Sequence, residues 1–140
     1  MTAALVDTNI AVYAYDPAEP QKRLRSQNLL RELSQSENLF LSVQVLNEFA
    51  AVLLRRTRGG KMDVDILETT RELSSLGTVL PLAATMTWLA LQAVEEHSMS
   101  FWDALIWATA KVQGLARVYS EDFQHGRTLE GVQFINPFLP

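Results

Sequence analysis

The chain alternates short apolar runs with longer stretches in which apolar residues recur at helical spacing. Such alternation is typical of a parallel β-sheet covered by helices on both faces. The apolar runs predict four strands and a fifth, edge strand before Asn136-Pro137: residues 3–6, 39–41, 77–80, 117–119 and 132–135. We therefore expect one domain over residues 1–140, an α/β/α sandwich with a central, mainly parallel sheet of four to five strands.

The stretches between these runs predict six helices, ended mostly by glycine, proline or polar residues. Their expected ranges are residues 10–15, 19–36, 42–58, 63–76, 85–97 and 101–112. Leu24 should belong to the apolar stripe of the second helix, and Trp88, Leu89 and Leu91 should face inward from the fifth. The sixth is so apolar, Trp102 included, that we expect it to be buried on most of its circumference.

The first apolar run stops abruptly at Asp7, Thr8 and Asn9. In open parallel sheets, ligands bind outside the carboxyl ends of the strands, which is where these side chains would lie. All three are also good N-cap residues, and for this triplet alone capping of the next helix is the favoured explanation. A chemical role needs further acids in similarly unusual places.

Two further acids interrupt apolar surroundings. Glu48 has Val45 and Val52 one turn away, so its carboxylate projects close to the apolar side of its helix. It should meet a cation, lie at the edge of a cleft or extend to water. Asp103 is the only carboxylate of the apolar segment 101–112; with Ser100 it has the spacing of a capping box, which explains its position but not its surroundings.

The end of the fourth predicted strand repeats the first pattern, because Ser120, Glu121 and Asp122 follow an apolar run. Carboxyl ends of parallel strands share one rim, so acids after the first and fourth strands could meet there. Asp103 and Glu48 can reach the same rim. We therefore expect one pocket that contains all four acids.

Composition limits the chemistry of such a pocket. Hydrophobic residues make up 48% and charged residues 20% of the chain, as in ordinary globular proteins, and no apolar run is long enough to span a bilayer. We expect a cytoplasmic protein without membrane contact. Cysteine is absent, which removes thiolate catalysis and cysteine-based metal sites, and the net charge of −4 argues against bulk electrostatic coating of nucleic acid.

Clustered carboxylates repel one another unless protons or a cation neutralise them. Ligands that are all oxygen select a hard ion such as Mg²⁺ or Mn²⁺, and such ions typically act on phosphates. One ion would orient a phosphodiester and activate water, and two would stabilise the attacking and leaving oxygens symmetrically. The pattern therefore favours metal-dependent phosphodiester chemistry with one or two ions.

Taken together, these motifs resemble the PIN-domain nucleases, and specifically the VapC-type ribonuclease toxins of prokaryotic toxin–antitoxin pairs. The segments that carry the resemblance are Asp7-Thr8-Asn9, Asn47-Glu48, Trp102-Asp103-Ala104 and Ser120-Glu121-Asp122-Phe123, and it extends over nearly the whole chain. It implies a magnesium- or manganese-dependent endoribonuclease that forms a homodimer and is inhibited by a cognate antitoxin. The implied acidic quartet is Asp7, Glu48, Asp103 and Asp122, with Thr8, Asn9 and Ser120 as supporting polar groups.

The fourth acid stays open at this stage, because Glu121 adjoins Asp122 and could be the one that points inward. Four basic residues could contact the RNA backbone, although they also suit the end of a helix: Arg55, Arg56, Arg58 and Lys61.

Three other classes of protein compete with this interpretation. A phosphoacceptor receiver domain has similar size and architecture, but Asp7 is not one of a pair of acids and no lysine follows the last strand at Asn136-Pro137. A metal-free ribonuclease would need His97 and His125, whose positions favour helix-end and surface roles. A housekeeping or catalytically silent protein of the same fold is the third alternative.

Overall fold

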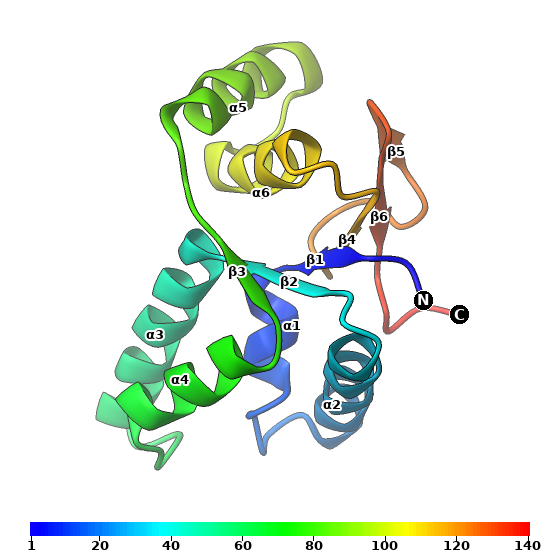
Figure 1. The fold of residues 1–140 in the computed structure, drawn as a ribbon. Helices are drawn as coiled ribbons and strands as arrows, with labels where there is room; N and C mark the ends of the chain where they lie inside the picture. The colour runs from blue at the N-terminus through cyan, green and yellow to red at the C-terminus, as the bar shows by residue number, and fades with distance from the viewer.

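A computed structural model describes all residues from 1 to 140 and contains one six-stranded sheet in the order β3-β2-β1-β4-β6-β5 (Figure 1). The strands are β1 (Ala4–Val6), β2 (Leu39–Ser42), β3 (Thr78–Leu80), β4 (Arg117–Tyr119), β5 (Thr128–Leu129) and β6 (Val132–Ile135). All neighbouring strands pair in parallel except β5 and β6. The predicted α/β class is confirmed, with six strands instead of four to five.

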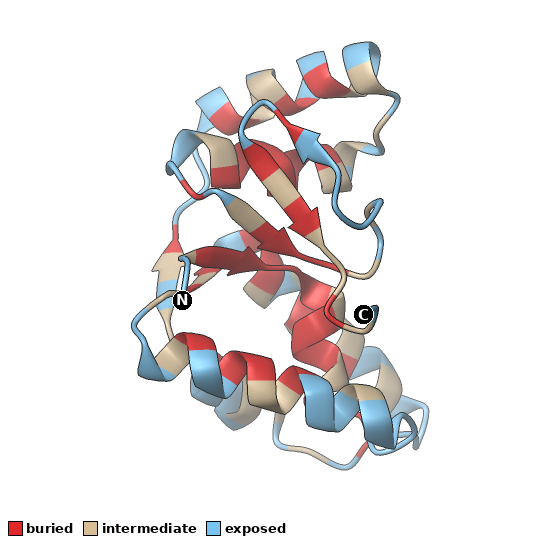
Figure 2. Ribbon diagram, turned by 90° about the vertical axis from the view of Figure 1, so that its right-hand side faces the viewer, coloured by how far each residue is buried: buried red, intermediate tan, exposed pale blue.

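Helices cover both faces of this sheet. They are α1 (Thr8–Tyr13), α2 (Pro20–Gln35), α3 (Val43–Arg58), α4 (Ile66–Ser75), α5 (Ala84–His97) and α6 (Phe101–Val112). Figure 1 shows α5 and α6 on one side of the sheet and α1 to α4 on the other. Buried residues line the strands and the helix surfaces that face them (Figure 2), and the hydrophobic ones form a core cluster of 33 residues. None of the helices combines the length and the apolar character needed to cross a membrane.

Strand β1 lies between β2 and β4, with Leu5 in register with Phe40 on one side and Val118 on the other. Ala4, Leu5 and Val6 are fully buried because both faces of this central strand are covered. From β1 the chain proceeds to β2 on one side and later to β4 on the other. The carboxyl end of β1 is thus the switch point at which such sheets bind ligands, and Asp7 follows it directly.

The strand predicted at residues 132–135 is present as β6, but the prediction that it lies at the edge of the sheet was wrong. Strand β6 pairs with β4 on one side and with β5 on the other, so the short β5 forms the edge. Glu130 and Gly131, which join β5 to β6, both have positive φ, at 48° and 86°. This is the backbone of a two-residue hairpin turn, for which Asn-Gly or Asp-Gly is the usual sequence signal. Because Glu130 stands where Asn or Asp is usual, the sequence did not predict this hairpin.

Several helix details also differ from expectation. Helix α4 begins at Ile66 and not near Asp63, because the Asp65 side chain accepts a hydrogen bond from the Glu68 N–H at 3.0 Å and caps it. Helix α1 begins at Thr8, directly after β1, instead of at Ile10.

The predicted inward faces were wrong at four large side chains, which are exposed: Leu24, Trp88, Leu91 and Trp102. Helix α5 instead buries the smaller face formed by Met86, Ala90 and Ala93. Periodicity located these helices but misassigned the buried face, because α5 and α6 contain apolar residues on more than one side.

Candidate functional site

Asp7 lies at the carboxyl end of β1, where it caps α1 and also faces the pocket. Its Oδ1 accepts a hydrogen bond from the Thr8 N–H at 2.7 Å, and its Oδ2 accepts one from the Ser120 hydroxyl at 2.7 Å. The residue is only 5% exposed. Asp7 therefore has both of the roles considered from the sequence: its carboxylate caps α1 and also lines the pocket.

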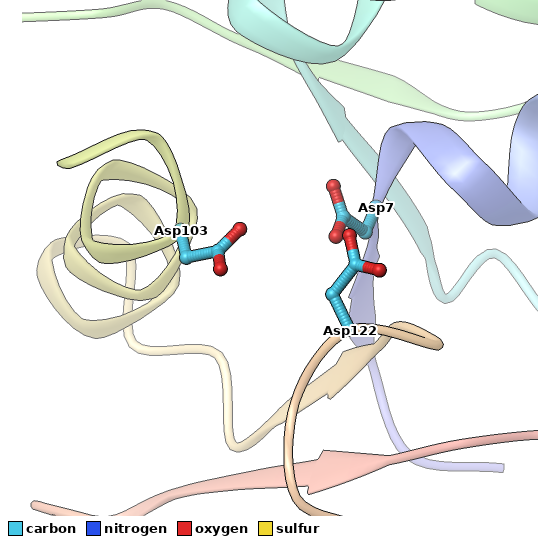
Figure 3. A group of neighbouring side chains, drawn as sticks. All are labelled: Asp7, Asp103 and Asp122. Carbon is cyan, nitrogen blue, oxygen red and sulfur yellow. The ribbon is translucent and has the colours of Figure 1, made fainter. Parts of the chain in front are cut away.

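Asp103 reaches the pocket from the first turn of α6. The Ser100 hydroxyl caps this helix by accepting a hydrogen bond from the Asp103 N–H at 3.2 Å. The carboxylate of Asp103 points toward Asp7 and Asp122 (Figure 3). The spacing expected of a capping box thus reflects a cap supplied by Ser100.

Asp122 follows β4 and lies beside Asp7. The buried Ser120 hydroxyl donates to Asp7 and accepts from the Asp122 N–H at 3.1 Å, so one side chain connects the loops that hold both acids. Asp7, Asp103 and Asp122 each present a carboxylate oxygen within 4.8 Å of the others. Asp7, more than ninety residues before the other two in the chain, meets them here, as Figure 3 shows.

The arrangement makes the charged form of Asp7 costly. Burial raises its pKa to about 6, against the hydrogen bonds from Ser120 and Thr8, and the negative charges of Asp122 and Asp103 raise it further. Burial also raises the pKa of Asp103, against a hydrogen bond with Ser100 that lowers it, and the charge of Asp122 adds to the rise. Mutual repulsion of this kind is relieved by a proton or by a cation.

The donor set fits a hard divalent cation. All three candidate ligands are carboxylate oxygens, with no nitrogen or sulfur among them, which is the preference of Mg²⁺ and Mn²⁺. A second observation agrees with a polar occupant: the buried Thr8 Oγ1 has no hydrogen-bond partner, and Thr8 lines the same cavity. That cavity has a volume of about 250 Å³.

Glu48 lines this cavity but does not belong to the close cluster of three aspartates. Its Oε1 accepts a hydrogen bond from Gln44 Nε2 at 2.8 Å, one turn earlier on α3. The same amide nitrogen donates to the backbone oxygen of Trp102 at 3.1 Å. Glu48 thus lies at the edge of a cleft, one of the surroundings expected for it, and is linked to the start of α6.

The structure distinguishes Glu121 from Asp122. The Glu121 carboxylate pairs with Lys22 Nζ at 2.5 Å and accepts a hydrogen bond from the Tyr13 hydroxyl at 2.5 Å. Burial alone would raise the pKa of Glu121, but these two partners outweigh it and lower the pKa below its ordinary value. Glu121 is therefore held by groups on α1 and α2, and Asp122 is the acid that lies beside Asp7.

Asn9 also supports the loop after β4. Its Nδ2 donates to the Ser120 hydroxyl and its Oδ1 accepts from the Glu121 N–H, both at 3.4 Å. Of the four basic residues, Arg55 and Arg56 line the acidic cavity, whereas Arg58 and Lys61 are exposed and do not. Arg56 also pairs with the buried Asp16 at 2.9 Å.

The two histidines lie outside the acidic cavity. His97 is 3.8 Å from carboxylate oxygens of Glu96 and Glu130, and His125 Nδ1 accepts a hydrogen bond from the Asn136 N–H at 3.0 Å. Their positions agree with helix-end and turn roles.

Sequence reasoning missed Gln44 and the Lys22–Glu121 pair. Gln44 carries a signal, since it precedes Glu48 by four residues on one helix face, but an amide there is common on surface helices. Lys22 and Glu121 are 99 positions apart, and no local pattern connects them.

Comparisons with known proteins agree with this geometry. The sequence profile of the PIN domain matches residues 4–128. A comparison with curated protein sequences gives no match. Among solved structures, the Mycobacterium tuberculosis toxin VapC20, which cleaves the sarcin-ricin loop, is similar with a TM-score of 0.65 at 21% identity, covering 86% of this chain and 90% of that one.

Two solved complexes show the same fold. A toxin–antitoxin complex from Klebsiella pneumoniae gives a TM-score of 0.69 at 17% identity, over 97% of this chain and 98% of that one. VapBC2 from Rickettsia felis, bound to a DNA fragment from its promoter, gives 0.69 at 15% identity, over 95% and 97%. These identities establish likeness of fold, and the profile match establishes the family. The chain therefore belongs to the PIN domain family.

Proposed function

We propose that this protein is an endoribonuclease that uses Mg²⁺ or Mn²⁺ to hydrolyse RNA phosphodiester bonds and acts as the toxin of a toxin–antitoxin pair. The observation that carries the proposal is the convergence of Asp7, Asp103 and Asp122, with Asp7 buried and its pKa raised to about 6. Folding this cluster without a neutralising partner is unfavourable, so it is better explained by a ligand than by stability. VapC20, a fold relative, cleaves RNA of the sarcin-ricin loop, which supports RNA as the substrate.

In this proposal the three aspartates hold the metal, and Glu48 completes an acidic quartet at the edge of the cavity. Divalent-metal chemistry of this kind supplies a polarised phosphate and a more acidic attacking water. Ser120 positions the carboxylate of Asp7 and the backbone of Asp122, and Thr8 offers a hydroxyl to a ligand that enters the cavity.

Arg55 is best placed of the four basic residues to contact the RNA backbone, because it lines the cavity and has no carboxylate partner. Arg56 lies there too but is paired with Asp16, while Arg58 and Lys61 would act only on more distant phosphates. One arginine beside a metal-neutralised cluster suits a phosphodiester, since positive charge is then available on both sides of the phosphate.

The partner we propose is a cognate antitoxin. Two fold relatives were solved as toxin–antitoxin assemblies, which supports such a partner for this chain. An arginine supplied by the antitoxin can pair with the carboxylates and take the place of the cation. We also propose that the chain acts in the cytoplasm, as a homodimer and as a single PIN-like domain over residues 1–140.

The test combines expression with cleavage. Production of this chain alone should arrest growth, Asp7→Asn should relieve the arrest, and the antitoxin encoded beside it should bind the chain and block cleavage of RNA. Purified protein should cleave structured RNAs with Mg²⁺ or Mn²⁺ and not with excess chelator. Cleavage of RNA without growth arrest would favour a housekeeping nuclease, and absence of cleavage in a folded, metal-loaded protein would favour a silent member of the fold.

A further inference from the structure

An exposed aromatic side chain stands directly beside the acidic cavity. Trp102 is 61% exposed although it belongs to the most apolar helix of the chain, and it adjoins Asp103 in sequence. Its backbone oxygen accepts a hydrogen bond from Gln44 Nε2, and its ring packs edge to face with Phe101 at 5.1 Å between centroids. The backbone of Trp102 is therefore anchored to α3, while most of the residue remains exposed.

Trp102 also forms a wall of a second, mainly apolar hollow of about 270 Å³. The other residues that line it are Gln44, Asn47, Glu48, Ala51 and Leu82. Gln44, Glu48 and Trp102 line both this hollow and the acidic cavity, so the two spaces are adjacent. Its only charged residue is an acid, so the hollow suits a flat, neutral and largely apolar group better than a phosphate.

Gln44 supplies a second observation that points to a ligand. The residue is 4% exposed, and its Nε2 donates to two acceptors, Glu48 Oε1 and the Trp102 backbone oxygen. This fixes the orientation of the amide, because an exchange of nitrogen and oxygen would place an acceptor against two acceptors. The Gln44 Oε1 is consequently buried without any donor, a cost that a ligand N–H could remove.

We propose that Trp102 and this hollow hold the base of one nucleotide next to the scissile phosphate, with the base stacked on the indole ring and an N–H directed to Gln44 Oε1. The inference rests on the proposed ribonuclease function. A nucleotide joins a charged phosphate to a flat neutral base through one sugar, which matches an acidic, metal-binding cavity beside an apolar one. A base can enter the hollow only when it is not paired.

The test is a binding experiment that does not depend on cleavage. The Asp7→Asn protein is titrated with a single-stranded oligoadenylate of about eight nucleotides and with a ribose–phosphate oligomer of equal length that lacks bases. Stacking on an aromatic side chain changes affinity by about 10- to 100-fold, so the oligoadenylate should bind more tightly by about that factor. Trp102→Ala should abolish the preference, and Trp102→Phe should retain most of it.

Trp88→Ala is the matched control, because Trp88 is 62% exposed on α5 but lines neither of the two spaces. It should leave the preference unchanged. The third tryptophan, Trp107, is buried and gives a constant background, so a Trp88→Phe protein reports fluorescence quenching at Trp102 alone.

Equal affinity for the two oligomers, or an unchanged preference in Trp102→Ala, would overturn the proposal. It is also overturned if Trp102→Ala lowers the molecular mass in solution without changing RNA binding, because the surface then lies between copies of the chain. Cleavage by the wild-type protein is measured separately with Mn²⁺. Cleavage without a base preference would support the ribonuclease function and contradict the stacking site. Base-dependent quenching without cleavage would support the stacking site and contradict the ribonuclease function.

Discussion

The Lys22 ammonium pairs with the Glu121 carboxylate at 2.5 Å and joins α2 to the residue that precedes Asp122. The Tyr13 hydroxyl donates to the other oxygen of Glu121, and Lys22 Nζ lies 4.8 Å from the Tyr13 ring centroid. This contact ties the loop after β4 to α1 and α2. Asp122 itself is exposed, so its position depends on how firmly its neighbours are held.

Breaking this ion pair should weaken metal binding more than it weakens the fold. We expect Lys22→Met to reduce Mn²⁺ affinity several-fold in calorimetric titration, because the loop that holds Asp122 becomes less ordered. The free energy of unfolding should change by no more than about 1 kcal/mol, as for other partly exposed ion pairs. Lys111→Met is a matched control, since it removes the Lys111–Glu130 pair at 2.9 Å, away from the acids. Equal Mn²⁺ affinities in the two variants would contradict the assigned role of Lys22.

Asp7 should make the metal-free protein less stable as the pH rises. In the folded chain its pKa is about 6, against 3.8 as the ordinary value, so the folded state binds more protons than the unfolded state between these values. The free energy of unfolding therefore falls as pH rises through this window. Between pH 5 and pH 7.5 this one group should contribute a loss on the order of 1 kcal/mol.

Urea unfolding in the presence of chelator measures this effect. The Asp7→Asn protein should lack that part of the pH dependence and should be at least as stable as the wild type at pH 7.5. Mn²⁺ should stabilise the wild type at pH 7.5 and stabilise the variant much less. Parallel pH profiles for the two proteins would show that Asp7 does not titrate in this range.

Ser120→Ala should raise the pH below which metal affinity, and any cleavage, begins to fall. The Ser120 hydroxyl donates to Asp7 Oδ2 at 2.7 Å and lowers the pKa of Asp7, so its removal should raise that pKa further above about 6. A pH series of Mn²⁺ affinity from 5.5 to 8.5 would reveal the shift. Ser120→Thr retains the hydroxyl and should retain the wild-type profile. A uniform loss of affinity at every pH in Ser120→Ala would instead indicate a steric effect.

Substitution of Ser100 should affect stability, whereas substitution of Asp103 should affect activity. Ser100→Ala removes the cap of α6 and should lower stability by about 1 kcal/mol while the protein keeps its activity. Asp103→Ala should abolish metal-dependent cleavage with a smaller effect on stability, because its backbone N–H can still reach Ser100. The comparison uses thermal unfolding and cleavage of the same RNA. Similar activity in the two folded variants would exclude Asp103 from the site.

Most strands of the sheet, and Asp7 and Asp103 of the predicted four acids, follow from local patterns in the sequence. An apolar run that stops at an acid identifies β1 and Asp7, and an acid within an apolar helix identifies Asp103. The hairpin of β5 and β6 escaped prediction because its turn lacks the usual residues and β5 has only two.

The surroundings of the acids could not be predicted in the same way. Whether Trp102 is buried depends on which side of α6 packs against α5 and the sheet. A helix with apolar residues on every side has no sequence pattern that identifies its buried face. The choice between Glu121 and Asp122 depends on Lys22, which only the tertiary fold brings near. Long-range pairs of this kind carry no periodic signal in one sequence.

The position of β1 in the middle of the sheet affects when the site can exist during synthesis. Strand β1 is made first, but β4 pairs beside it only after residues 117–119 have been made, and Asp122 comes later still. A partly synthesised chain therefore contains Asp7 without the oxygens of Asp103 and Asp122. Because domains fold during translation from the N-terminal side, the three carboxylates cannot come together before residue 122 has been made.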